Sequence, residues 1–124
     1  MSQQENLYNF LNNVSDDVSG FIGGSVVDLD TGMALASISR SSDFDLDIAA
    51  AYNSEMVKAK FKTMRALGID GGLVDMLLTL RDQLHLIKLL DNQMFVYVAV
   101  SSEQSNLALL RAAVNSNTRR YGLA

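Results

Sequence analysis

The sequence contains no cysteine, no proline and no tryptophan, and its one histidine is His85. Without cysteine the chain can form neither disulfide bonds nor thiolate zinc sites, and it has no thiol nucleophile. A single histidine excludes a multi-histidine metal site within one chain and leaves His85 as the sole imidazole for a nucleophile–histidine pair. These absences argue against an enzyme and against a bound metal or cofactor.

Positive charge is also scarce. Ten basic residues stand against 14 acidic ones, which gives a net charge of −4, whereas nucleic-acid binding draws most of its affinity from cations that neutralise phosphates. The apolar runs, such as residues 95–100, fall far short of the roughly 20 residues that span a bilayer. The first residues lack the basic start and apolar stretch of a secretory signal. We therefore expect a cytoplasmic protein that binds neither membranes nor nucleic acids.

The composition is that of a globular protein. The chain has 124 residues, of which 48% are hydrophobic and 19% are charged. This length suits one domain over residues 1–124, with enough buried surface for a core. No internal repeat, linker or low-complexity stretch interrupts it.

The first part of the chain predicts a helix followed by a β-hairpin. Ser2 and Glu5 have the spacing of a capping box, and an apolar stripe at helical spacing continues to Val18 before Gly20. Residues 21–28 and 33–39 then predict two strands joined by a glycine-containing turn. The pair Gly23-Gly24 is unusual in a strand unless something packs closely against the backbone.

The second part predicts a long helix, three strands and a last helix. Residues 44–67 follow a possible cap at 41–43, and their apolar arc is wider than a helix lying on one sheet requires. That width indicates either deep burial or a second partner. Strands are predicted at 73–80, 84–90 and 94–100, and the last of these is apolar on both faces, as in a central strand. Ser101-Ser102 is expected to cap the final helix, so the order α-β-β-α-β-β-β-α indicates an α+β domain.

Few motifs carry chemistry. Asp30-Thr31-Gly32 after an apolar run is similar to the active-site motif of dimeric aspartic proteases, in which two aspartates share a proton. The alternative is a hairpin turn whose aspartates bond their own backbone. The glycines of 68–72 lack the Gly-Lys-Ser/Thr ending of a phosphate-binding loop. His85 is expected on a half-exposed strand, where pH sensing or partner contact suits it better than catalysis.

Several segments in combination resemble the roadblock family of dynein light chains and bacterial GTPase-associated proteins. Residues 20–32 resemble the family's first hairpin, residues 73–100 its three-strand meander, and residues 105–111 the start of its last helix. The resemblance covers nearly the whole chain. It implies a five-stranded antiparallel sheet with the long helix on one face and the two terminal helices on the other.

The resemblance also implies a non-enzymatic homodimer that regulates or scaffolds a Ras-like small GTPase, with a possible GTPase-activating role, or that joins a larger complex. Dimerisation would use the long helix and the third strand, which lacks proline and is therefore poorly protected against pairing. The residues expected at the dimer interface are Ile48, Tyr52, Glu55, Met56, Ala59, Thr63, Asp75, Leu77 and Thr79.

Two other functions stay open at this point. One is a small-ligand sensor of profilin-like topology, with its mouth near Gly23-Gly24 or in the loop 68–72. The other is a dimeric aspartic protease that uses Asp30.

Overall fold

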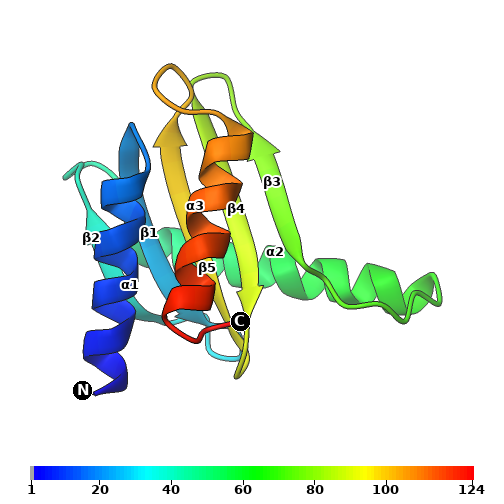
Figure 1. The fold of residues 1–124 in the computed structure, drawn as a ribbon. Helices are drawn as coiled ribbons and strands as arrows, with labels where there is room; N and C mark the ends of the chain where they lie inside the picture. Colours follow the sequence, from blue (N-terminus) through cyan, green and yellow to red (C-terminus); the bar gives the residue numbers. More distant parts are fainter. Residues whose placement is uncertain (1) are drawn as a thin grey trace.

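Eight helices and strands follow one another in the computed structural model, which describes residues 2–124 (Figure 1). Their order is the predicted α-β-β-α-β-β-β-α. The elements are α1 (Gln3–Asp17), β1 (Phe21–Asp28), β2 (Ala34–Ser39), α2 (Leu46–Ala66), β3 (Asp75–Thr79), β4 (Gln83–Leu90), β5 (Met94–Ser101) and α3 (Leu107–Arg120). No helix in the described part of the chain is long and apolar enough to cross a membrane.

Each helix begins directly after a side chain that accepts hydrogen bonds from its first turn. Ser2 Oγ accepts from the Glu5 N–H at 3.1 Å, as the capping pattern predicts. The other two predicted caps were wrong. Asp45 caps α2 by accepting from the N–H groups of Asp47 and Ile48, and Asn106 caps α3. The Ser101-Ser102 pair cannot serve because β5 ends at Ser101 and α3 begins only at Leu107.

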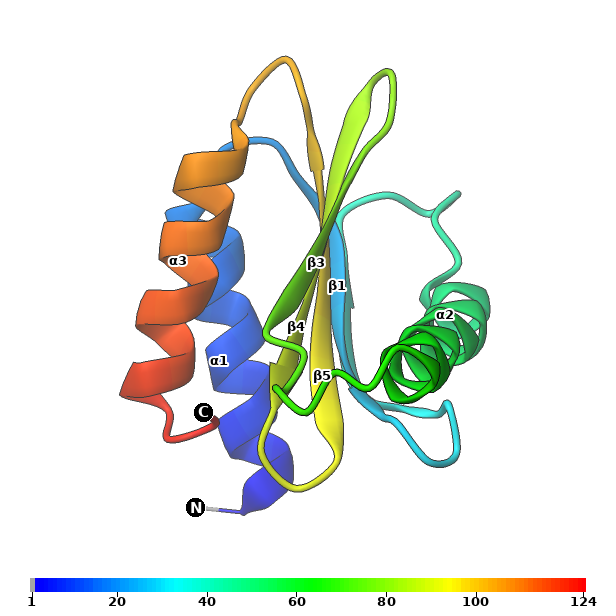
Figure 2. The ribbon, with the colours of Figure 1, turned by 90° about the vertical axis from the view of Figure 1, so that its right-hand side faces the viewer.

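The five strands form one antiparallel sheet in the order β2-β1-β5-β4-β3. Helices α1 and α3 cover one face and α2 covers the other, as Figure 2 shows and as the family resemblance implies. Strand β5 is central, and residues 94–100 are all buried between the two helical layers. Strand β3 is an edge strand and is shorter than the predicted 73–80.

The sheet divides the core into two clusters of buried side chains. One lies under α1 and α3 and is centred on Phe10, Leu11, Val96 and Val98. The other lies under α2 and is centred on Val57, Ile87, Phe95 and Tyr97. The alternation of β5 side chains between the two faces supplies both clusters at once.

Close packing explains the two adjacent glycines of β1. A Cβ on Gly24 would lie 3.1 Å from the Tyr97 carbonyl oxygen and 3.3 Å from the Phe21 ring. A Cβ on Gly23 would lie 3.4 Å from both Phe44 and Leu46. Since neighbouring side chains fill the space, the glycine pair does not open a ligand-binding mouth.

We predict that Gly20→Ala destabilises the fold more than Gly68→Ala does. Both glycines have positive φ, +74° and +71°, so alanine is strained at either position. Only at Gly20 would the new Cβ also collide, at 2.8 Å from Gln104 Cβ, whereas nothing lies within 4 Å of Gly68. Urea unfolding should show an additional loss of about 1–3 kcal/mol at Gly20. Equal losses would contradict the steric explanation.

Candidate interaction surface

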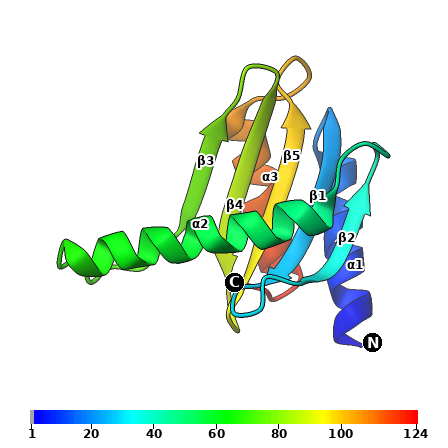
Figure 3. The ribbon, with the colours of Figure 1, turned by 180° about the vertical axis from the view of Figure 1, so that it is seen from behind.

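Helix α2 crosses the sheet and extends past it. Figure 3 shows the helix running across the strands over one part of the sheet, with its C-terminal part projecting beyond the edge strand β3. The rest of this sheet face, toward the hairpin between β3 and β4, has no helix over it (Figure 3). The fold therefore leaves a projecting helix and an uncovered part of a sheet face side by side.

The projecting helix carries an exposed stripe on the side away from the sheet. Tyr52 is 74% exposed and Ile48 is 57% exposed, although both are large apolar side chains. Of the six helical residues predicted at a dimer interface, only Met56 is half-buried. The structure thus gathers the six on one helix face, at the i, i+3 and i+4 spacings of neighbours. The exposed members are Ile48, Tyr52, Glu55, Ala59 and Thr63.

The three strand residues predicted at the same interface point to the other side of the sheet. Asp75 accepts from Arg111 of α3 at 3.0 and 3.1 Å, and its side chain is only 15% exposed. Leu77 packs against the core cluster under α1 and α3. Thr79 pairs with Leu84, which belongs to that cluster too. A partner molecule on the α2 side could contact these three residues only through their backbone groups at the edge of the sheet.

The sequence reasoning missed the two β3 side chains that do face α2, which are Met76, packed against the cluster under α2, and Leu78. Leu78 is half-buried and pairs with His85, whose ring bonds Tyr97 of the cluster under α2. Leu80, at the start of the following hairpin, is 44% exposed. Because side chains alternate along a strand, Leu78 and Leu77 must lie on opposite faces of the sheet, but the sequence does not say which of these faces α2 covers.

Burial favours the neutral form of His85, and two neighbours bond its ring. Its Nε2–H donates to Gln83 Oε1 at 2.7 Å, so its Nδ1 accepts from the Tyr97 hydroxyl at 3.1 Å. The Phe44 and Tyr97 rings stand edge-on to the imidazole. Burial lowers the pKa of His85 below its usual 6.5 and raises the pKa of Tyr97 to about 12. Both groups are therefore uncharged near neutral pH.

Acidification should destabilise the fold through His85. The unfolded chain takes up a proton near pH 6.5, whereas the folded chain resists protonation until a lower pH. Stability from this group is thus complete above pH 6.5 and is lost as the pH falls from there toward the folded pKa. Urea unfolding across this range should show the loss in the wild type and not in His85→Gln. Parallel profiles for the two proteins would contradict the prediction, since the chain has no other histidine.

Charge is distributed unevenly along α2. Asp45 and Asp47 lie at its start, following Asp43 in the preceding loop. Four of the chain's ten cations lie between residues 58 and 65 in its second half, namely Lys58, Lys60, Lys62 and Arg65. One end of the helix is therefore acidic, and the end that projects beyond the sheet is basic.

The Asp-Thr-Gly motif forms a hairpin turn. Asp28 Oδ2 accepts from the Thr31 N–H at 3.1 Å and from the Thr31 hydroxyl at 2.7 Å. Asp30 is exposed at the tip, and its backbone oxygen accepts from Lys58 Nζ. The pattern is thus the turn in which an aspartate bonds its own backbone, within an α+β fold, and not part of an aspartic protease fold.

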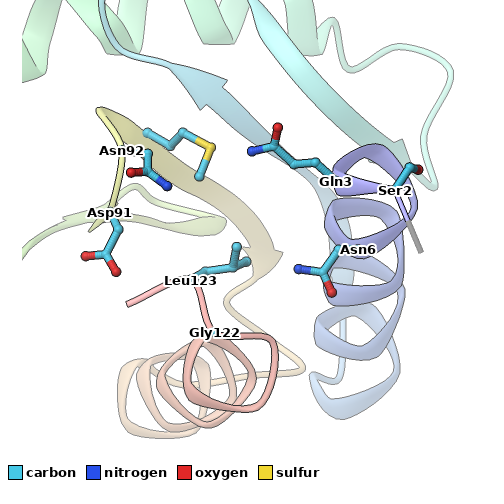
Figure 4. Close-up of a pocket in the computed structure, with 8 residues that line it drawn as sticks. Ser2, Gln3, Asn6, Asp91, Asn92, Gly122 and Leu123 are labelled. Carbon is cyan, nitrogen blue, oxygen red and sulfur yellow. The ribbon is translucent and has the colours of Figure 1, made fainter.

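The depression in Figure 4 does not lie where a small-ligand sensor was expected to have its binding site. That depression, of about 320 Å³, lies among the start of α1, the β4–β5 turn and the C-terminal residues, with Gln3, Asn6, Asp91 and Asn92 around it. It includes neither Gly23-Gly24 nor the loop 68–72, but Gly72 of that loop lines a different depression, of about 260 Å³, beside α2. Within residues 2–124, no three His, Asp or Glu side chains gather closely enough to hold a metal ion.

Comparison with known proteins gives matches in structure alone. No protein-family model matches the chain, and no curated protein matches it by sequence. The solved structure of Myxococcus xanthus MglB is similar at a TM-score of 0.85 and 12% identity, over 96% of this chain and 86% of that one. A Roadblock/LC7 domain from Streptomyces avermitilis gives 0.80 and 16%, over 93% and 96%.

A third similar structure, the gliding protein MglB from Thermus thermophilus, gives a TM-score of 0.81 and 12% identity, over 98% of this chain and 90% of that one. At such identities the likeness concerns the fold. It covers nearly the whole length of each chain, and it agrees with the element order and the arrangement of layers described above. This chain therefore has the fold of the roadblock family.

Proposed function

We propose that the chain is a non-enzymatic homodimeric regulator or scaffold that binds a Ras-like small GTPase. The observation that carries the dimer is the arrangement of α2, which projects beyond β3 and leaves part of its own sheet face uncovered (Figure 3). A second copy, related by a twofold axis beside β3, would place its projecting helix over that uncovered part. Such an interface is self-complementary, because the same surface serves both copies.

The edge strand and the exposed stripe support the same arrangement. Strand β3 has no proline, and Asp75, its one charged residue, pairs inward with Arg111. Unpaired backbone groups along such an edge favour pairing with a second strand. The large exposed side chains Ile48 and Tyr52 would lose contact with water in the same step.

The charge distribution of α2 favours an antiparallel pair of helices. A twofold axis beside β3 sets the basic second half of one helix near the acidic start of the other. Opposite charges across an interface fix the orientation and suppress the alternative one, in which like charges would meet. The parallel arrangement would instead bring together the cations at 58–65 of both copies.

The GTPase partner rests on the fold shared with the MglB and Roadblock/LC7 structures and on the role that this resemblance implies. In this proposal the dimer acts by holding or ordering the GTPase and supplies no catalytic group of its own. Stimulation of hydrolysis would then come from ordering of the GTPase's own residues.

The test is binding to purified Ras-like GTPases from the same genome, each loaded with GDP or with a non-hydrolysable GTP analogue. We expect at least one to bind the dimer with a preference for one nucleotide state, measured by calorimetry. Single-turnover GTP hydrolysis with and without the chain then separates activation from tethering. Binding to none of them would contradict the GTPase part of the proposal and leave the dimer to its own test.

A further inference from the structure

An apolar groove with a basic rim lies on the flank of α2 that faces the β4–β5 turn. Two adjacent depressions, of about 340 and 260 Å³, share Leu29, Phe61 and Gln93 in their linings. Leu73 and Leu89 extend the apolar floor, and Lys58 and Arg65 form the rim. The half-buried Phe61 lines both depressions together with Leu29 and Gln93, so the two adjoin as one groove.

The two cations lie on the same helix face as the aromatic ring. Lys58, Phe61 and Arg65 follow one another at spacings of three and four, which puts them in a row along α2. The row spans roughly 10 Å, a length that three or four residues of extended chain cover. The groove therefore has the length and shape for a short extended segment with one apolar anchor between two charges.

Both cations have capacity for a new anionic partner. Lys58 Nζ donates to the Asp30 backbone oxygen at 3.1 Å and lies 3.9 Å from the exposed Glu55 carboxylate. An ammonium has three N–H donors, and an exposed pair of this kind is weak enough for an incoming carboxylate to replace. Arg65 makes no ion pair with any other residue of the 2–124 region that the structure describes. Gln93 lines both depressions and offers an amide that can bond a peptide backbone.

We infer that this groove binds an acidic linear peptide segment of a partner protein, with one leucine or phenylalanine side chain against Phe61 and carboxylates at Lys58 and Arg65. An acidic peptide suits this groove because its carboxylates would pair with the cationic rim. The rim stands out because the chain as a whole has a net charge of −4. The open shape suits an extended peptide rather than an enclosed small molecule.

The apolar floor of this site is separate from the exposed stripe of the proposed dimer interface, whereas Lys58 and Arg65 also belong to the basic half of α2 that the dimer would set near the partner's acidic helix start. The exposed stripe that carries Ile48 and Tyr52 lines neither depression. The proposed second copy lies beside β3, over the part of the sheet that α2 leaves uncovered. A peptide in the groove needs neither a dimer nor a GTPase, and sedimentation of each charge variant beside the wild type distinguishes a lost peptide site from a weakened dimer.

The probe is a short fluorescent peptide with a central phenylalanine between pairs of glutamates. It is compared with a twin in which lysines replace the glutamates and with a twin in which alanine replaces the phenylalanine. Fluorescence anisotropy should show binding of the acidic, phenylalanine-containing peptide only, weakened by added salt. Amide NMR shifts should map this binding to Leu29, Phe61 and Gln93.

The double variant Lys58→Glu/Arg65→Glu should bind the acidic peptide at least about tenfold more weakly. The double variant Lys60→Glu/Lys62→Glu is the matched control, since it changes the net charge of the same helix by the same amount but neither residue lines the groove, and it should bind like the wild type. Equal weakening by both variants would overturn the inference, because it would indicate general charge attraction. Failure of the acidic peptide to bind would also overturn it, as would amide shifts in the groove that only phosphatidylserine vesicles produce.

Discussion

Replacing Ile48 and Tyr52 together by lysine is expected to convert the protein from a dimer to a folded monomer. Both side chains are exposed in the single chain, so the substitutions leave its core untouched. In the proposed dimer they lie at the interface, where an unpaired charge loses its water without gaining a partner. The dissociation constant should rise at least about a hundredfold, measured by sedimentation equilibrium over a range of concentrations.

The control for this experiment is Leu109→Lys on α3. Leu109 is 61% exposed, comparable to Ile48, but α3 covers the opposite face of the sheet (Figure 2). We expect this variant to dimerise like the wild type. A wild type that sediments as a monomer, or a double variant that still dimerises with wild-type affinity, would show that the α2 stripe is not the interface.

Phe95→Ala is expected to cause the largest loss of stability among single changes in the core. Phe95 is 0% exposed, belongs to the central strand and pairs with Leu89 and Val27 on its two neighbours. Truncation leaves a cavity between the sheet and α2, so the free energy of unfolding should fall by about 3–5 kcal/mol. Urea unfolding at one fixed protomer concentration measures this loss, because the mass-action contribution of a dimer is then the same for both proteins.

Phe95→Leu serves as its control. Leucine keeps most of the apolar volume, so the loss should stay below about 1.5 kcal/mol. If both variants unfolded at the same urea concentration, the packing of α2 on the sheet would not depend on filling this site. The denaturant slope should be the same in all three proteins, which shows that the change lies in stability.

The ends of helices and strands were predictable where only one nearby residue or sequence pattern could mark the end. Strand β1 has the predicted bounds 21–28, and Ser2 caps α1 as its pattern indicates. The caps of α2 and α3 were misplaced because several polar residues near each helix could each accept a backbone hydrogen bond. Asp45 and Asn106 serve because each stands directly before the first helical residue.

The candidate surface was predictable only in part. Helical spacing alone gathers the α2 residues of the stripe on one face, and all of them except the half-buried Met56 are exposed there. For β3 the period of two divides the side chains into two sets without saying which set faces α2. Asp75, Leu77 and Thr79 lie on the α1 and α3 side, while Leu78 faces the other way.

By itself the sequence determined the element order, the α+β class and the central place of β5, because periodicity and composition act within each segment, whereas the edge position of β3 came from the family resemblance. The absence of cysteine excluded disulfide bonds and thiolate sites, and the single histidine excluded a multi-histidine metal site within one chain. The tertiary structure alone decided how far α2 projects beyond β3 and which flank of it forms a groove with Leu29 and Gln93. These features depend on contacts between segments far apart in the chain, whose geometry no local pattern records.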